Sequence, residues 1–268
     1  MQVERELPYN SSVSVGFLHT RGLHLIISRN VNVPLPASVC PPATNPNLCR
    51  PDPNFGNNGR FEGSGNSNYN GLVFSFNKRA NRFAGVRFSY AFSKAIDNAG
   101  NAFFSSPQNN FNLRDERGLS DNDQRHRLTL SGTLNTPQAD NNSFMRQIYG
   151  GFQLSYIYTY ASNLPFNVLL GTDRNGDTNF NDRPIGVGRN TGIGFDFSSF
   201  DVRLSRRFRF SERFGLEILA EGFNLFNSSN FAVPRNTFGS GVTPVANFGT
   251  PQSAFDPRQI QLGAKFSF

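Results

Sequence analysis

The stretch Gln259-Ile-Gln-Leu-Gly-Ala-Lys-Phe-Ser-Phe268 ends the chain and shows the pattern that decides its fold. Every second position carries an apolar side chain: Ile260, Leu262, Ala264, Phe266 and Phe268. Polar or small residues fill the positions between them. Successive side chains of a β-strand point to opposite faces, so this alternation predicts a strand with one apolar and one polar face.

The same period of two recurs in seven other segments, near residues 13–17, 72–76, 82–92, 128–134, 152–160, 201–210 and 214–221. The sequence therefore predicts about eight strands of roughly ten residues, the length that a tilted strand needs to cross a bilayer. One apolar residue from each of seven strands is expected to face lipid: Phe74, Phe88, Leu130, Leu154, Leu204, Ile218 and Leu262.

The links between these segments alternate in length. Short links cover 77–82, 136–147 and 210–213, whereas long links rich in Asn, Gly, Pro and Asp cover 30–68, 97–124, 171–197 and 228–257. Long loops without regular structure count against a compact soluble domain. Short turns at one end and long loops at the other are typical of an outer-membrane β-barrel. A soluble β-sandwich or jelly roll also alternates, but its loops would not be sorted so regularly by end.

The composition agrees with an all-β chain. It has 33 Asn, 25 Gly, 16 Pro and 29 Phe residues, which favour turns and half-buried strands over helices. No run approaches 18 apolar residues, which excludes a transmembrane helix. The mean hydropathy of −0.43 leaves a barrel open, because alternating strands average to near neutral.

The chain is basic but does not resemble a nucleic-acid-binding protein. Its net charge of +7 comes from 23 Arg and 3 Lys against 19 acidic residues. These cations are scattered along the chain, whereas phosphate binding needs them clustered. We therefore expect no nucleic-acid partner.

The only two cysteines, Cys40 and Cys49, lie in a Pro-rich segment. Their spacing fits a small loop disulfide in an oxidising compartment, worth about 2–3 kcal/mol. The charged start Met1-Gln-Val-Glu-Arg-Glu precedes no apolar segment, so no secretory signal peptide is visible. Either the protein is cytosolic or its true start lies upstream.

Seven short motifs resemble one family, in the order in which that family carries them. They are Arg21-Gly-Leu-His-Leu, Tyr69-Asn-Gly-Leu, Tyr90-Ala-Phe-Ser-Lys-Ala-Ile-Asp97, Ser120-Asp-Asn-Asp-Gln-Arg-His-Arg127, Asn181-Asp-Arg-Pro184, Glu221-Gly-Phe-Asn-Leu-Phe-Asn227 and Asp256-Pro-Arg-Gln-Ile-Gln-Leu-Gly-Ala-Lys-Phe-Ser-Phe268. The chain resembles the C-terminal part of TonB-dependent outer-membrane receptors. Among these it is most similar to the large Oar-like proteins with a carboxypeptidase-regulatory-like N-terminal domain.

The resemblance implies that residues 1–268 form the last strands of a plugged barrel of about 22 strands, without the plug and the first strands. It implies transport or reception in the outer membrane rather than enzymatic activity. The implied partners are membrane lipid, an unknown solute, TonB through the absent N-terminal part, and the barrel-assembly machinery through the strand that ends at Phe268. A secreted carbohydrate-binding β-sandwich and a porin-like passive channel remain the alternatives.

Several polar clusters resemble functional sites, but we expect no catalytic, cofactor-binding or metal-binding residue among them. The segment Asp173-Arg-Asn-Gly-Asp-Thr-Asn-Phe-Asn-Asp182 resembles the start of a calcium loop. It departs from that pattern because Thr178 replaces the turn glycine and Pro184 the bidentate glutamate. An Asx-rich extracellular turn is the preferred interpretation.

The remaining polar residues are expected to be structural. The group Asp121, Asp123, Arg125, His126 and Arg127 could support acid–base chemistry, but no nucleophile accompanies it, so a network at the extracellular rim is favoured. His19 and His24 have no acidic neighbours in sequence, and Ser64 lacks a strand–helix context. Two roles are possible for the charged residues Arg203, Arg207, Arg209, Glu217 and Glu221. They could pair across neighbouring strands inside the lumen, or they could contact an anionic solute or the plug.

Overall fold

The computed structural model describes residues 1–35, 39–40, 46–100, 106–136, 150–210 and 213–268. Ten strands form one antiparallel sheet: β1 (Gln2–Leu7), β2 (Ser11–Asn30), β3 (Gly59–Lys78), β4 (Ala84–Asp97), β5 (Gly118–Leu119), β6 (His126–Asn135), β7 (Phe152–Ala161), β10 (Phe197–Arg209), β11 (Gly215–Phe223) and β12 (Gln259–Ser267). A separate two-stranded sheet joins β8 (Pro165–Phe166) to β9 (Gly192–Ile193). Two short 3₁₀ helices, η1 (Pro46–Cys49) and η2 (Leu113–Glu116), lie in the loops.

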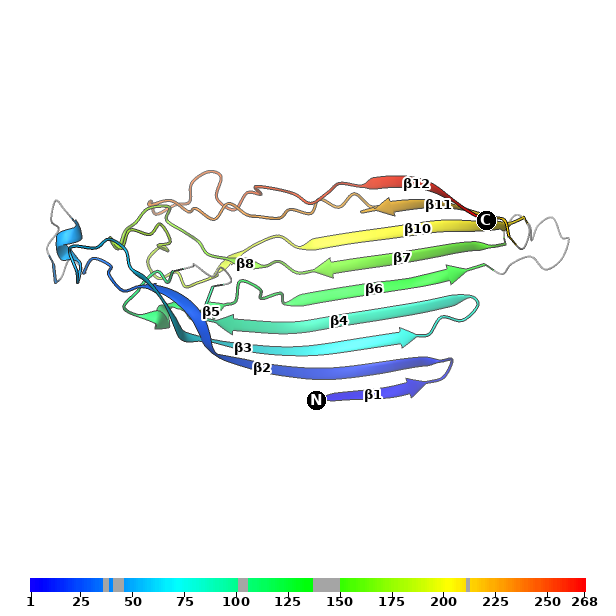
Figure 1. Ribbon diagram of the computed structural model, residues 1–268, viewed down its shortest axis with the longest axis horizontal. Coiled ribbons are helices and arrows are strands. Elements are labelled where there is room, and N and C mark those ends of the chain that lie inside the picture. Colours follow the sequence, from blue (N-terminus) through cyan, green and yellow to red (C-terminus); the bar gives the residue numbers. More distant parts are fainter. Residues whose placement is uncertain (36–38, 41–45, 101–105, 137–149, 211–212) are drawn as a thin grey trace.

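The main sheet is a meander, in which each strand pairs with its neighbours along the chain. Its order is β1-β2-β3-β4-β6-β7-β10-β11-β12, and β5 extends the pairing of β4. The sheet is open, with β1 and β12 at its two edges (Figure 1). No helix among the described residues is long and apolar enough to cross a membrane.

The connections are sorted by end, as the sequence predicted. The long links gather at the left end of the sheet in Figure 1, and the short turns lie at the right end, where the chain also terminates. The turn from Lys78 to Ala84 is short as expected. The predicted links 136–147 and 210–213 include residues outside the described part of the chain.

All eight predicted strands are present. The structure has further strands that were not predicted, and two of the predicted strands are longer than expected. The hairpin partner β1 was missed, because Arg5 interrupts its apolar face between Val3 and Leu7. The strands β2 and β3 are 20 residues long, about twice the predicted length. Backbone pairing continues along them after the apolar alternation stops, with register shifts beyond Leu23.

The register gives the sheet two chemically different faces. Phe88, Leu130, Tyr158 and Phe200 are direct cross-strand partners along β4, β6, β7 and β10. A second row joins Leu134, Leu154, Leu204, Ala220 and Leu262. The alternation places all seven predicted lipid-facing residues on this apolar face.

One cation breaks the pattern of the apolar face. Arg206 pairs across the sheet with Phe152 and Ile218, so it lies among apolar residues. Its guanidinium carbon sits 4.8 Å from the ring centre of Phe152 and 4.7 Å from that of Phe208. The two rings offer their electron-rich faces to the cation close to the short-turn end of β10.

Most of the tightly buried side chains lie outside the middle of the sheet, although Ser205 of β10 is an exception. Among the described residues, buried apolar side chains are few and belong to strand ends and loops: Ile27, Val33, Cys49, Ala99, Ala161, Val168 and Leu170. Buried polar residues outnumber them and include Asp97, Glu116, Asp182, Arg183 and Arg189. The sheet therefore carries a packed, polar layer of loops at its long-loop end.

Candidate functional site

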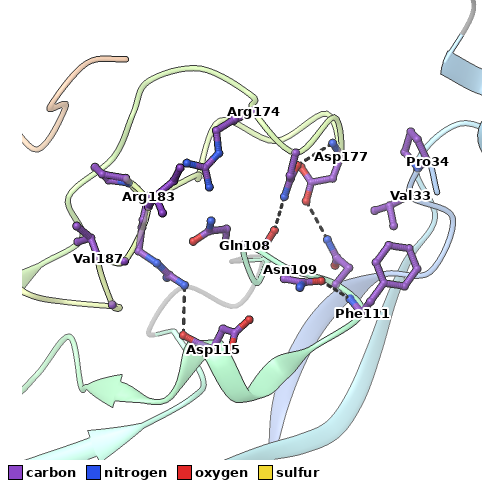
Figure 2. Close-up of a pocket in the computed structure, with 16 residues that line it drawn as sticks. Val33, Pro34, Gln108, Asn109, Phe111, Asp115, Arg174, Asp177, Arg183 and Val187 are labelled. Atoms are coloured by element: carbon purple, nitrogen blue, oxygen red, sulfur yellow. Dashed lines mark hydrogen bonds between the residues drawn. The ribbon is translucent and has the colours of Figure 1, made fainter. Parts of the chain in front are cut away.

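Three long loops line an open cavity of about 720 Å³ at this end of the sheet. Val33 and Pro34 come from the β2–β3 loop, residues 108–111 and Asp115 from the β4–β6 loop, and residues 174–188 from the loop between β8 and β9. Figure 2 shows Arg174, Arg183 and Asp177 around the space, with Phe111 and Val33 at one side. Charged and apolar groups of the wall are thus supplied by segments far apart in sequence.

The segment 173–182 is held by its own carboxylates, as the Asx-turn interpretation predicted. Asp173 accepts hydrogen bonds from the backbone N–H groups of Gly176, Asp177 and Thr178 at 2.7–3.2 Å. Asp182, which is completely buried, accepts from the N–H groups of Arg174 and Asn175. Among the described residues, no group of three or more His, Cys, Asp or Glu side chains is placed to hold a metal ion.

Asp177 ties this segment to the opposite wall of the cavity. Its carboxylate accepts 2.9 Å and 3.1 Å hydrogen bonds from the Asn179 N–H and the Asn110 amide. Burial raises the pKa of Asp177, and the nearby charges of Asp173 and Asp182 raise it further against the lowering effect of the hydrogen bonds. The ionised form is therefore less favourable in the folded loops than in water.

A buried ion pair holds Arg183, one of the residues of the cavity wall. Arg183 donates from two nitrogens to the two carboxylate oxygens of Glu116, at 2.8 Å and 3.2 Å, and also to the carbonyl of Asp115. The side chains of Arg183 and Glu116 are only 5% and 9% exposed. This bidentate contact joins two loops through residues that are 67 positions apart, and it orients both side chains.

A second buried arginine joins the same loops to the sheet. Arg189 pairs with Asp97 at the end of β4 and donates to Asp121 at 3.1 Å. The amide of Asn190 donates to Asp121 at 2.6 Å. Arg189 thereby anchors the loop between β8 and β9, which lines the cavity, to the end of β4.

The predicted loop disulfide is confirmed. Cys40 and Cys49 are bonded, with Cα atoms 5.7 Å apart. Close by, Arg50 is buried and donates to the carbonyl of Asn32 and, at 2.9 Å, to Asn57. The disulfide and these bonds hold the tip of the β2–β3 loop.

The predicted rim group is a structural network rather than an acid–base pair. Asp123 accepts from the Ala95 N–H at 2.6 Å and from Arg125 at 3.0 Å. His126 instead lies 2.8 Å from the Tyr90 hydroxyl and packs against the rings of Tyr90 and Phe92. Asp121 is engaged by Arg189, and Arg127 is exposed on the other face of β6.

The isolated candidates also have plain roles. His19 hydrogen-bonds to Asn70 at 2.8 Å, and His24 to the Gly63 carbonyl at 3.3 Å. Ser64 lies within β3 and donates to Glu62, so it is not placed as a nucleophile.

The expected cross-strand ion pairs are present on the polar face. Arg203 lies 3.5 Å from both Glu217 and Glu221, and Arg207 lies 3.3 Å from Glu217. The Arg209 side chain is outside the described part of the structure. Charge pairing on this face and apolar rows on the other match a lumen wall and a lipid-facing wall.

These features define a class of protein: the wall of an outer-membrane β-barrel, capped by extracellular loops that line a polar cavity. Residues 1–187 and 185–261 match the family model of the outer membrane beta barrel domain. The chain belongs to this family and is located in the outer membrane.

Two solved structures are similar to the chain. The outer membrane transporter YddB from Escherichia coli has 12% identity and a TM-score of 0.60, over all of this chain and 32% of that one. P. aeruginosa FpvA, solved with heterologous pyoverdines and iron, has 12% identity and a TM-score of 0.49, over all of this chain and 27% of that one. The chain therefore spans about a third or less of these proteins. No curated protein matches it.

The sequence did not predict the ion pairs that join the loops around the cavity. Arg183 pairs with Glu116 and Arg189 with Asp97, and the two partners of these buried pairs are 67 and 92 residues apart in sequence. The segment Asp173–Asp182 and the motif Asn181-Asp-Arg-Pro184 pointed to one wall of the cavity, without indicating that Asp182 and Arg183 would be buried.

Proposed function

We propose that the chain is the C-terminal wall of a TonB-dependent outer-membrane transporter or receptor, within a barrel of about 22 strands. The observation that carries this proposal is the open sheet, in which β1 and β12 are separate edges. Each edge exposes a row of N–H and C=O groups, and in lipid each unpaired group costs several kcal/mol. Further strands, continuous with this chain, would satisfy both edges.

The similarity to YddB supports the same proposal at the level of fold. All of this chain aligns with about a third of that transporter, as expected for one sector of a larger wall. The seven sequence motifs supply the TonB-dependent and Oar-like assignment. The secreted β-sandwich does not fit, because the strands of the described residues form one main sheet without a second sheet packed over it.

In this proposal the loop cavity belongs to the extracellular entrance. Arg174 is exposed and lines the cavity beside the buried Asp177. An entering solute would contact the charge of Arg174 before it reaches the lumen. The chain supplies no catalytic residue in this scheme, and its work is binding and passage.

The test separates an energised, plugged transporter from a porin-like channel. The complete protein that contains this chain is inserted into planar bilayers, and uptake is measured in cells with and without TonB. We expect little steady conductance, because a plug fills the lumen, and uptake that stops without TonB. Steady conductance with TonB-independent uptake would establish the passive channel instead.

A second experiment addresses the sector itself. The 268-residue chain alone, in liposomes, should pass no solute larger than a simple ion, because closing eight or nine strands leaves an interior filled by side chains. Sustained passage of a larger solute would show that the chain is a complete channel.

A further inference from the structure

A cluster of three cations and one histidine lies on the outward face of the sheet, just above the apolar band of β2, β3 and β4. His19 and Arg21 are on β2, Lys94 is on β4, and Arg117 comes from the adjoining loop beside β5. Cross-strand pairing joins His19 to Asn70 and Asn70 to Lys94. The three cations and His19 thus come together on one surface, which we call the outer basic groove.

The groove is built to meet an anion. It has a volume of about 410 Å³, and its wall is completed by Asn68, Asn70 and Ile96, with no carboxylate among its lining residues. Arg21, Lys94 and Arg117 are exposed, and so is His19. His19 is oriented by Asn70, and Arg117 by a 2.8 Å bond to Asn66.

The side chains of Arg21 and Lys94 make no hydrogen bond or ion pair with the described part of the chain. On the lumen face, by contrast, Arg203 and Arg207 are paired with glutamates. The groove therefore presents positive charge that the protein does not neutralise.

The position of the groove along the membrane normal indicates which kind of partner it can contact. On the same face, Phe17, Leu72 and Phe92 are cross-strand partners and are 51%, 47% and 46% exposed, as expected for side chains in contact with lipid. His19 and Arg21 follow Phe17 by two and four residues on β2. At roughly 2.6 Å of height per residue in a tilted strand, they lie about 5 and 10 Å above the apolar band, at headgroup level.

This height is on the side of the long loops, which is the extracellular side and therefore the outer leaflet. We propose that the outer basic groove binds the phosphates of a phosphorylated glycolipid of the outer leaflet, whose acyl chains lie against Phe17, Leu72 and Phe92. Arginine and lysine both bind phosphate, arginine through its fork of donors and lysine as a point charge. The proposal depends on the outer-membrane location and the register, and not on the TonB-dependent assignment.

The test uses the complete protein purified from outer membranes in a mild detergent. Retention of diphosphorylated lipid A is measured by native mass spectrometry for the wild type and for the double variant Arg21→Gln/Lys94→Gln. Each cation near a charged lipid surface changes the association constant about five-fold, so we expect about 30-fold weaker retention. The conservative variant Arg21→Lys/Lys94→Arg should retain the lipid.

The matched control removes two charges from the other face of neighbouring strands. Arg87→Gln/Arg127→Gln alters exposed arginines whose register places them toward the lumen, and it should leave retention within about two-fold of the wild type. Equal losses in the two double variants would overturn the proposal, because net charge alone would then explain binding. An unchanged outward-face variant would overturn it as well.

The choice of lipid is tested in the same way. Monophosphorylated lipid A should bind more weakly than the diphosphorylated form, and excess inorganic phosphate should not displace the bound lipid. Equal binding of phosphatidylglycerol, or displacement by phosphate, would contradict recognition of an outer-leaflet glycolipid.

Discussion

Replacing Leu130 by arginine tests the two faces of the sheet at a defined depth. Leu130 is the fifth of the ten residues of β6 and lies between its cross-strand partners Phe88 and Tyr158. His126 and Leu134 are each four residues away on the same face, or roughly 10 Å along the membrane normal. In an apolar band about 25 Å tall, Leu130 is therefore near the midplane.

We expect Leu130→Arg to lower the free energy of unfolding by about 2–4 kcal/mol and Leu134→Arg by about 0–1 kcal/mol, because the cost falls toward the interface. The lumen control is Thr129→Arg, which faces Ser89 and Thr159 and should cost much less than Leu130→Arg. Ser131 is unsuitable, because its partner is Arg87 and a second cation there would be repelled.

The measurement is reversible urea unfolding of the complete protein in lipid vesicles, followed by far-ultraviolet circular dichroism because this chain has no tryptophan. Equal costs at residues 129 and 130 would refute the assignment of the faces. Equal costs at 130 and 134 would refute the depth.

Three further predictions concern the loops and the C-terminus. Glu116→Ala leaves the Arg183 charge buried without its partner, so local opening of residues 174–188 should become easier by about 3–5 kcal/mol, as measured by hydrogen exchange, with little change in the exchange of the sheet. Because the pKa of Asp177 is raised, its contribution to loop stability is fully present below the ordinary value of 3.8 and is lost as the pH rises through the higher folded-state pKa. Exchange at residues 177–179, corrected for intrinsic rates, should therefore be better protected at the acid end, and Asp177→Asn should remove this dependence. Deleting Phe268 should lower the outer-membrane yield but leave refolding in detergent largely intact, since its ring is 92% exposed and stacks only on Phe266 among the described rings; normal insertion would contradict an assembly role.

The sheet could be predicted because its signal is local. A strand between lipid and lumen must alternate, so residues such as Leu154, Tyr156 and Tyr158 reveal their common face within a few positions. The prediction was wrong where this requirement ends. The upper half of β2 keeps its backbone pairing above the membrane, where no apolar face is needed, and β1 carries Arg5 among its apolar residues.

Arg206 shows that a broken alternation can still belong to a membrane strand. A cation on the apolar face is costly at the midplane and much less so near an interface. Arg206 lies three residues from the end of β10, and Phe152 and Phe208 provide a partner surface for its charge. The alternation of β10 therefore persists through a residue that, taken alone, would argue against it.

The loop layer could not be predicted, because its stability comes from a different source. Buried apolar side chains there are few, and the loops are held by carboxylates that cap backbone N–H groups and by buried arginines with acidic partners. Such groups tolerate burial only when they are hydrogen-bonded, so each requires a partner of a particular geometry. For Arg183 and Arg189 that partner is supplied by another loop, and no periodic pattern in the sequence connects the two. The residues that line the cavity are consequently those whose positions depend most on the completed fold.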